Sequence, residues 1–354
     1  MDFGISLAPH AESWKVVAAA EAAGFVRAWF VDSQLINADL FVAMTAAAMK
    51  TSRIKLATGM LIPSNRIAPV AANALASLAR LAPGRVELGI ATGFTARRSM
   101  GLGPIKMAAL AEYVRVVTRL LAGETVEWEF EGERRKIRFL NPELGQIDIS
   151  RPIPLHVSAL GPKMRAYAAA LGASFVQPVG NVEIAVRAAR EIAEAWRKAG
   201  RDAKDLRITA ACNGAVRREG EAWDSPRMKA QAGPGAAIIL HDLVETPSFG
   251  SSGHGLPPGI AAKVDAFRPI YESYQPADAR YLEAHRGHIM VVRQEEEHLI
   301  DGELIQRLTL SGTVAELRDK LRRLRDAGYT HFTTHIRHGQ PDMVADWAEV
   351  VAGV

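Results

Sequence analysis

Two kinds of residue in this chain could do chemistry: glycine-containing turns that follow apolar runs, and histidines near the ends of such runs. The run at residues 86–91 passes directly into Thr92 and Gly93. A buried strand that ends in such a turn presents unpaired backbone N–H groups, and in parallel α/β folds ligands bind at this end of the strands. Glycines at short spacing are common, so the turn indicates a ligand site only if such a fold surrounds it.

His10 and His156 are the candidates for a general acid or base. His10 follows the first predicted strand, and strand alternation puts His156 on the same side as Ser158. Each has a plain alternative, since His10 could be a solvated loop residue and His156 could fill the interior of the fold. His335 and His338, near the end of the last predicted strand, carry the same ambiguity.

The elements that must position these residues alternate along almost the whole chain. Eight short apolar runs are typical of strands: residues 3–7, 26–31, 54–59, 86–91, 153–158, 174–178, 206–211 and 330–336. Longer amphipathic stretches typical of helices separate them. Eight units of this kind predict an α/β fold, a (β/α)8 TIM barrel with insertions over residues 1–354, rather than an open doubly wound sheet.

Two segments interrupt the alternation. Residues 124–150 hold a pattern of period two around Glu131 and Gly132, which predicts an inserted hairpin. Residues from about 217 to 300 show no clear strand, and their loop 246–259 is rich in Gly, Ser and Pro, so it could act as a lid. The charged run 295–298 lacks a metal-binding signature and is expected on a solvated helix face.

Composition excludes several classes of protein. Of 354 residues 48% are hydrophobic, enough for a large core, and the net charge of +4 is spread along the chain. The densest basic cluster, residues 134–136, is expected on a solvated hairpin, with no nucleic-acid partner. One cysteine, Cys212, excludes an intramolecular disulfide and a cysteine-based zinc site. We find no metal signature, signal peptide or membrane span, so a cytoplasmic protein is expected.

Three segments resemble the bacterial luciferase-like superfamily of flavin-dependent monooxygenases and deazaflavin-dependent reductases. They are residues 56–93, 154–173 and 310–328, in the order that the family has them. The first is the most specific, because its strand, its helix and its Pro-Gly-Arg turn all match. The resemblance covers nearly the whole chain and implies the same (β/α)8 barrel.

The resemblance implies a site at the carboxyl ends of the strands. Members often carry a non-prolyl cis peptide behind the isoalloxazine ring, and the matching bond here joins Gly59 and Met60. Thr92 and Gly93 would contact the ring or its ribityl chain, and Asp32 lies at the corresponding end of the second strand. The cofactor phosphate would meet the helix start after the fifth strand and a wall after the sixth, formed by Ser158, Ala159, Leu160, Gly161, Pro162, Lys163, Val179 and Gly180.

The chain departs from two branches of the superfamily. Its sugar-phosphate dehydrogenases carry His directly after the aspartate and Glu directly after the glycine, where this chain has Ser33 and Phe94. The acid–base pair for a sugar alcohol is therefore missing. Luciferases have an arginine where this chain has Thr92, and Glu-His-His where it has residues 32–34, so light emission is not expected.

An apolar ceiling over the ring is suggested by Phe94 together with Met60, Leu61 and Trp29. Such a ceiling suits oxygen chemistry because it excludes water. Arg97 and Arg98 could steer an anion or lie on the surface.

We therefore expect a flavin-dependent oxidoreductase, a monooxygenase that uses reduced FMN and O2 on a small organic substrate. A separate NAD(P)H:flavin reductase would be its partner, and the family implies a homodimer or higher homo-oligomer. One alternative is hydride transfer with the deazaflavin coenzyme F420, because Thr92 and Gly93 look more like that branch. Another is a non-catalytic flavin-binding subunit, because Phe94 stands in place of an acid.

Overall fold

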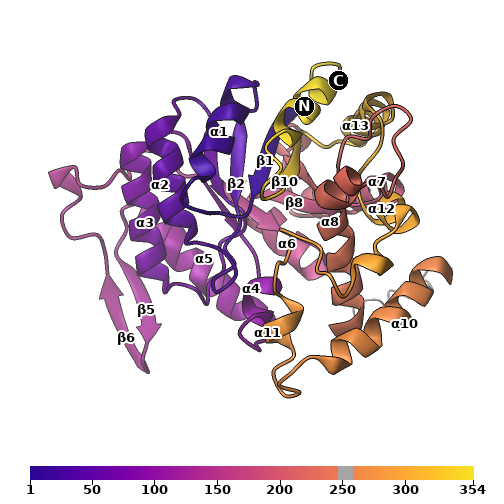
Figure 1. Cartoon of the computed structure of the whole chain (residues 1–354). Coiled ribbons are helices and arrows are strands. Elements are labelled where there is room, and N and C mark those ends of the chain that lie inside the picture. The colour runs from indigo at the N-terminus through magenta and orange to yellow at the C-terminus, as the bar shows by residue number, and fades with distance from the viewer. Residues whose placement is uncertain (246–257) are drawn as a thin grey trace.

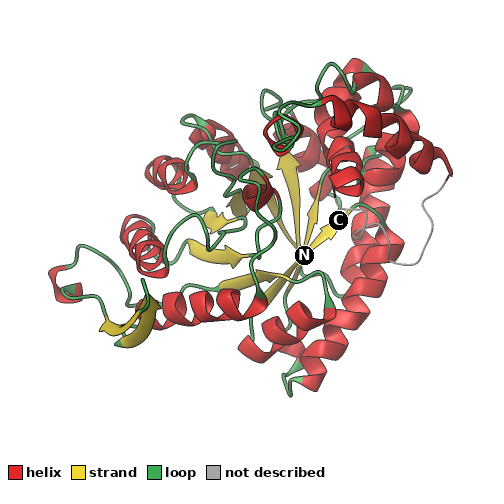
Figure 2. Ribbon diagram, turned by 90° about the horizontal axis from the view of Figure 1, so that it is seen from below, coloured by secondary structure: helices red, strands yellow, loops and turns green. Residues whose placement is uncertain are grey.

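The chain folds around a closed barrel of parallel strands. The structure is a computed structural model that describes residues 1–245 and 258–354. Around the barrel the strands are β1 (Asp2–Leu7), β10 (His331–Ile336), β9 (Ile208–Cys212), β8 (Ser174–Val179), β7 (Leu155–Ser158), β4 (Val86–Ile90), β3 (Lys55–Thr58) and β2 (Arg27–Phe30). Figure 2 shows these strands enclosed by helices. The predicted (β/α)8 TIM barrel is confirmed.

Helices follow the strands and cover the outside of the barrel. They are α1 (Ser13–Ala22), α2 (Leu40–Lys50), α3 (Ala68–Leu81), α5 (Met107–Leu121), α6 (Pro162–Leu171), α7 (Val182–Lys198), α13 (Val314–Asp326) and α14 (Met343–Val351). Local signals fix their starts: the Asp39 carboxylate accepts from the Phe41 and Val42 N–H groups ahead of α2. Thr313 forms a capping box with Glu316 at the start of α13.

Side chains along the strands alternate between two environments, as pleated strands require. One set faces outward and joins the helices in the main core, for example Ile5, Leu88 and Phe175. The other set fills the barrel interior. Because all eight strands run parallel, their carboxyl ends meet at one end of the barrel, which we call the mouth.

A helical insertion between β9 and α13 packs beside the mouth. It contains α8 (Pro226–Glu245), α10 (Pro258–Ser273), α11 (Tyr281–Ala284), the 3₁₀ turn η3 (Glu297–Leu299) and α12 (Gly302–Leu308). Figure 1 shows these helices gathered on one side of the barrel. Residues 246–257 of the loop expected to act as a lid lie outside the described residues, and residues 258–259 begin α10.

The prediction that residues 295–298 form a solvated helix face is wrong. The segment is a turn followed by η3, and Glu296 is only 1% exposed. Its carboxylate lies 2.5 Å from His241 Nε2 and 3.0 Å from Arg293 Nη2. Glu295, Glu297 and His298 are exposed, so the charged run crosses from solvent to a buried ion pair and back.

The expected hairpin lies outside the barrel. β5 (Val126–Phe130) pairs antiparallel with β6 (Glu133–Ile137), and Glu131 and Gly132 form the turn with positive φ angles. The basic residues 134–136 are exposed on it, as expected. Within residues 1–245 and 258–354, no helix combines the length and apolar character needed to cross a lipid bilayer.

Candidate active site

A charged cluster forms the floor of the barrel interior. The Arg27 guanidinium donates to Glu87 through Nε at 2.5 Å and Nη2 at 3.0 Å. Lys55 Nζ lies 3.2 Å from the same carboxylate, and His156 Nε2 lies 3.0 Å from its Oε2. Burial alone would raise the pKa of Glu87, but His156 and Arg27 hold it far below its usual range. His156 is therefore engaged in this floor, below the ends of the strands.

An apolar platform lies above the floor, nearer the mouth. Trp29 packs with Met60, Ala57 and Val176, and the His156 ring meets its indole edge to face at 5.1 Å. The peptide bond between Gly59 and Met60 is cis and non-prolyl, as the resemblance implied. A Cβ on Gly59 would lie 2.8 Å from the Trp29 Cβ, so glycine is needed for the close approach of β3 to Trp29.

Gly89 on β4 serves the same platform. A Cβ there would collide with the Thr58 carbonyl oxygen and would lie 2.7 Å from Met60 Sδ and 2.9 Å from Trp29 Cζ3. Leu61, expected in an apolar ceiling over the mouth, instead packs outward in the main core. That part of the prediction is wrong, because the residue after Met60 continues the strand alternation and pairs with Ile90.

Asp32 lies at the mouth, after β2, but other groups already bind its carboxylate. The Arg66 guanidinium donates to it at 2.9 Å, and the Ile62 N–H donates to Oδ2 at 3.0 Å. Burial raises the pKa of Asp32, and the Arg66 charge opposes that rise. The carboxylate thus ties the loop after β2 to the loop after β3.

Thr92 and Gly93 follow β4 at the mouth, where the sequence placed them. Gly93 has a φ of +79°, and a Cβ on it would lie 2.7 Å from Ile62 Cγ2. The Thr92 carbonyl oxygen accepts from the Ile105 N–H at 3.0 Å, which closes the loop that holds the short helix α4 (Thr95–Arg98). Only glycine combines this backbone conformation with this close contact.

Phe94, which the sequence analysis expected in an apolar ceiling, lies against Arg98. The Arg98 guanidinium lies 3.8 Å from the centre of its ring. Arg98 Nη1 also lies 2.5 Å from Asp242 Oδ1 and 3.3 Å from Glu245 Oε2, both on α8. Arg98 is therefore neither a surface charge nor a steering group, since it joins α4 to the insertion.

The residues expected to hold the phosphate divide into two groups. Ser158, Ala159, Leu160, Gly161, Pro162 and Lys163 surround the start of α6, where no described side chain caps the helix and nothing lies within 4 Å of a Cβ on Gly161. Lys163 is exposed beside it. Val179 instead points into the main core. Gly180 packs closely against Leu308, because a Cβ added to it would lie 2.8 Å from the Leu308 carbonyl oxygen. The start of α7 is closed by Asn181, whose Oδ1 accepts from the Ile184 N–H.

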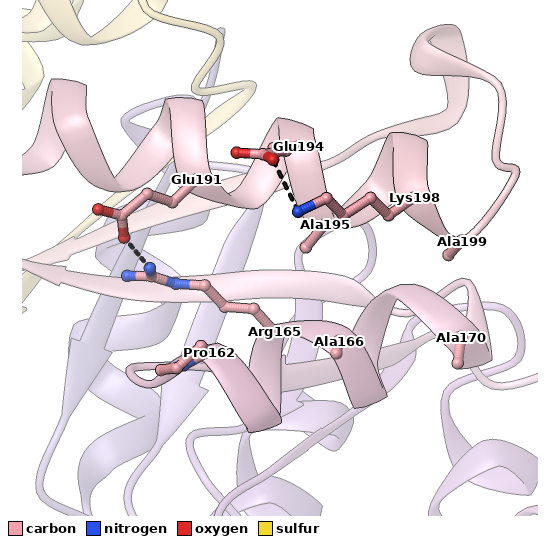
Figure 3. Close-up of a pocket in the computed structure, with 9 residues that line it drawn as sticks. All are labelled: Pro162, Arg165, Ala166, Ala170, Glu191, Glu194, Ala195, Lys198 and Ala199. Carbon is pink, nitrogen blue, oxygen red and sulfur yellow. Dashed lines mark hydrogen bonds and ion pairs between the residues drawn. The ribbon is translucent and has the colours of Figure 1, made fainter.

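A groove of about 530 Å³ lies on the outer surface between α6 and α7. Four of its nine lining residues are alanines. Figure 3 shows Arg165 of α6 paired with Glu191 of α7 across the groove, and Lys198 paired with Glu194 along α7. Its only overlap with the expected site is Pro162. Arg165 was missed by the sequence reasoning: its Nε donates to the Ala159 carbonyl oxygen at 3.3 Å, so it supports the loop 158–161 from below.

His10 lies at the rim of the mouth rather than inside it. Its backbone N–H donates to Ser13 Oγ at 2.8 Å and its Nδ1 accepts from the Glu12 N–H at 3.3 Å, so it closes the turn before α1. The ring of His338 meets it edge to face at 5.2 Å. Partial burial and His338 together lower the pKa of His10.

Several polar groups lie at the mouth, of which the sequence analysis had named only His335, with two possible roles. Ser6 Oγ lies 2.9 Å from His335 Nδ1, and His288 Nε2 from the insertion lies 3.0 Å from Thr95 Oγ1. Arg337 is buried and donates to the Gln231 and Ile289 carbonyl oxygens and to Asn213 Oδ1. Burial lowers the pKa of Arg337 to about 9. The one signal in the sequence was strand alternation, which puts Thr333, His335 and Arg337 on the same, inward side.

Comparisons with known proteins agree with this architecture. The profile of a family described as luciferase-like monooxygenase matches residues 6–331. The 5,10-methylenetetrahydromethanopterin reductase of Methanolobus tindarius is 29% identical over 272 residues, which are 75% of this chain and 78% of that protein. The F420-dependent glucose-6-phosphate dehydrogenase of Mycolicibacterium fortuitum is 35% identical over 181 residues, 46% of this chain and 50% of that protein.

A solved structure is similar over the full length. The coenzyme F420 dependent tetrahydromethanopterin reductase from Methanopyrus kandleri aligns with a TM-score of 0.74 at 22% identity, covering 99% of this chain and 98% of that one. At this identity the likeness establishes a common fold and no more. The match with the dehydrogenase likewise spans only half of that protein's length.

Proposed function

The chain belongs to the luciferase-like monooxygenase family, and from that premise we propose that it is an oxidoreductase that transfers hydride with coenzyme F420. The resemblance seen in the sequence to that family is confirmed. The observation that carries the proposal is the match to a methylenetetrahydromethanopterin reductase over 78% of its length. The first sequence hypothesis, a monooxygenase with reduced FMN, has weaker support than its deazaflavin alternative.

The mouth has the features that a planar redox ring requires. Trp29, Met60 and Val176 form an apolar surface, and Gly59 and Gly89 keep it clear of other side chains. Among the described residues Trp29 Nε1 is buried without a hydrogen-bond partner, a donor that a ring carbonyl or nitrogen could accept from. Thr92 and Gly93 would border the same ring.

The start of α6 suits the anionic tail of the cofactor. Its N–H groups are not capped by any described side chain, the space beside Gly161 is open, and Lys163 adds positive charge. A helix N-terminus of this kind attracts phosphate through its N–H groups and its dipole. In comparison, Asn181 already occupies the corresponding position on α7, so we assign the tail to residues 158–163.

The residues of this chain would then have the following roles. A bound deazaflavin supplies or accepts hydride at one face of its ring. The Trp29 platform would exclude water from that face, and the loop 92–95 would hold the ring edge. Asp32 would act indirectly, because Arg66 and the Ile62 N–H already engage it. Ser33 and Phe94 offer no acid or base, so we do not propose oxidation of a sugar phosphate.

The first experiment compares cofactors. Fluorescence titrations with F420 and FMN should give at least tenfold tighter binding of F420, and turnover with reduced F420 should proceed at the same rate with and without oxygen. Tighter binding of reduced FMN together with turnover that stops without oxygen would instead support the monooxygenase, with its reductase partner. Tight cofactor binding without any turnover would support a non-catalytic subunit.

A matched pair of variants at one position tests the tail site. Gly161→Asp and Gly161→Asn both introduce side chains that cap a helix well, so both should keep or raise the melting temperature. Only the aspartate adds negative charge beside the proposed phosphate, so it should weaken F420 binding about tenfold while the asparagine changes it little. Equal affinities in the two variants would place the tail elsewhere.

A further inference from the structure

Hydride transfer to or from a substrate that carries oxygen also requires a group that moves a proton, and the proposed function does not yet assign one. Asp32 is bound by Arg66, and His156 is bound by Glu87 in the floor of the barrel. His10 closes a turn at the rim. Ser33 and Phe94 take the places of the acid–base pair of the sugar-phosphate dehydrogenases. If the mouth contains a proton-transfer group, it lies on other strands.

Ser6 and His335 are placed for this task on the neighbouring strands β1 and β10. They are direct register partners, with Ser6 Oγ 2.9 Å from His335 Nδ1. Ser6 is also the register partner of Trp29 on β2, so it lies next to the platform proposed for the ring. Its strand neighbours Ile5 and Leu7 are buried, whereas Ser6 itself remains partly exposed. Ser6 is therefore accessible from solvent.

His335 stands behind Ser6 and is 3% exposed. In the described residues its Nε2 has no hydrogen-bond partner. Burial, and then the electrostatic effects of Arg337 directly after β10 and of His288 from the insertion, hold the pKa of His335 well below its usual value. The imidazole is therefore neutral at pH 7. A neutral imidazole with Nε2 protonated leaves Nδ1 free to accept from the Ser6 hydroxyl.

We propose that Ser6 and His335 form the proton-transfer pair of this site and that its substrate is an alcohol or the corresponding carbonyl compound. The proposal rests on the proposed function, with oxidised deazaflavin as the two-electron acceptor. In the oxidation, the substrate C–H bond breaks and its electron pair leaves with the hydrogen as hydride. The substrate O–H proton passes to Ser6 Oγ while the Ser6 proton passes to His335 Nδ1, and the C=O bond forms. Reduction reverses each transfer.

The first test needs no cofactor. In protein with ¹⁵N-labelled histidine, several of the ten histidines should be neutral at pH 7, and the signal of His335 should be that of a neutral ring with Nε2 protonated. His335→Asn should remove that signal, and Ser6→Ala should shift its Nδ1 resonance. A His335 that is charged at pH 7, or that carries its proton on Nδ1, would overturn the proposal even if the variants fold poorly.

The second test uses activity with F420 and small secondary alcohols or ketones. Ser6→Ala and His335→Asn should lower kcat by 10²–10⁴-fold, the range of general acid–base catalysis, and abolish the solvent isotope effect. F420 affinity should change less than threefold, and Ser6→Thr should restore part of the rate. The control His298→Asn alters an exposed histidine on η3 and should change nothing.

The outcomes separate the two proposals. A wild-type protein that binds no F420 contradicts the proposed function itself. A protein that binds F420 but reduces only acceptors with a charged C=N bond, which need no proton, would keep the function and overturn the pair. Full turnover in Ser6→Ala, or equal losses of turnover and F420 affinity in both variants, would also overturn it, because the residues would then be dispensable or merely structural.

Discussion

Replacing Glu87 with glutamine isolates the charge that holds the floor of the barrel. The substitution keeps the shape of the side chain but leaves Arg27, which is 4% exposed, without its carboxylate. Removing one partner of a buried ion pair costs about 3–5 kcal/mol. Lys55 is half exposed and can turn to solvent, so it adds little to this cost.

That free energy translates into a measurable shift in melting temperature. An unfolding entropy of about 2.1 cal/mol/K per residue gives roughly 0.7 kcal/mol/K for a chain of 354 residues. Glu87→Gln should therefore lower the Tm by roughly 4–7 °C in a calorimetric or fluorescence melt at pH 7. The control Glu112→Gln breaks an exposed pair with Arg115 on α5 and should change the Tm by less than about 1.5 °C.

The pH dependence follows from the direction of the shift. The folded pKa of Glu87 lies below its unfolded value of 4.5, so the carboxylate stabilises the fold above that pH. The difference between wild type and variant should be complete at pH 7 and should close as the pH falls below about 4.5. A Tm loss no larger than that of the control, or one independent of pH, would show that another group neutralises Arg27.

Three further predictions concern single residues. His156→Asn should lower stability by about 1–3 kcal/mol, because it removes a buried partner of Glu87, and should leave the pH profile of turnover unchanged. Gly93→Ala should weaken F420 binding at least tenfold and lower the Tm more than Gly132→Ala does, since both have positive φ but only Gly93 is crowded. Burial lowers the pKa of His285 to about 4 in the folded state, below its unfolded value of 6.5. Because the unfolded state then binds the proton more readily, the free energy of unfolding in urea melts should be about 1 kcal/mol lower at pH 5.5 than at pH 7.5 on account of this residue. His285→Phe should reduce that difference.

The barrel was predictable because its signals are local. Each strand was placed within two residues of its observed ends, for example 330–336 against His331–Ile336, since turns and alternation mark both limits. The insertion was not predictable in this way. Gly233, Pro234 and Gly235 are residues that usually end a helix, yet they lie inside α8. A Cβ on Gly235 would lie 2.6 Å from the Asn213 Cβ, so glycine is needed there for the close packing of α8 against the loop after β9.

The site was predictable only where a residue follows directly from a strand end. Asp32, Thr92 and Gly93 lie at the mouth for that reason. The partner of Asp32 could not be predicted, because Arg66 belongs to a different loop and local spacing carries no signal for that pairing. Glu87 did carry a signal, since a charge that interrupts a buried strand must face a partner. Finding Arg27 required the register of the barrel, which only the closed fold provides.

The two sides of the mouth therefore differ in chemistry. On the side of β2 and β4, Asp32 binds Arg66, and Arg98 lies over the Phe94 ring while it pairs with Asp242. On the side of β1 and β10, Ser6 is partly exposed, and His335 Nε2 has no hydrogen-bond partner among the described residues. A substrate that exchanges a proton during hydride transfer should thus place its oxygen toward β1 and β10. The cofactor ring, against Trp29, would then lie between the substrate and the charged floor.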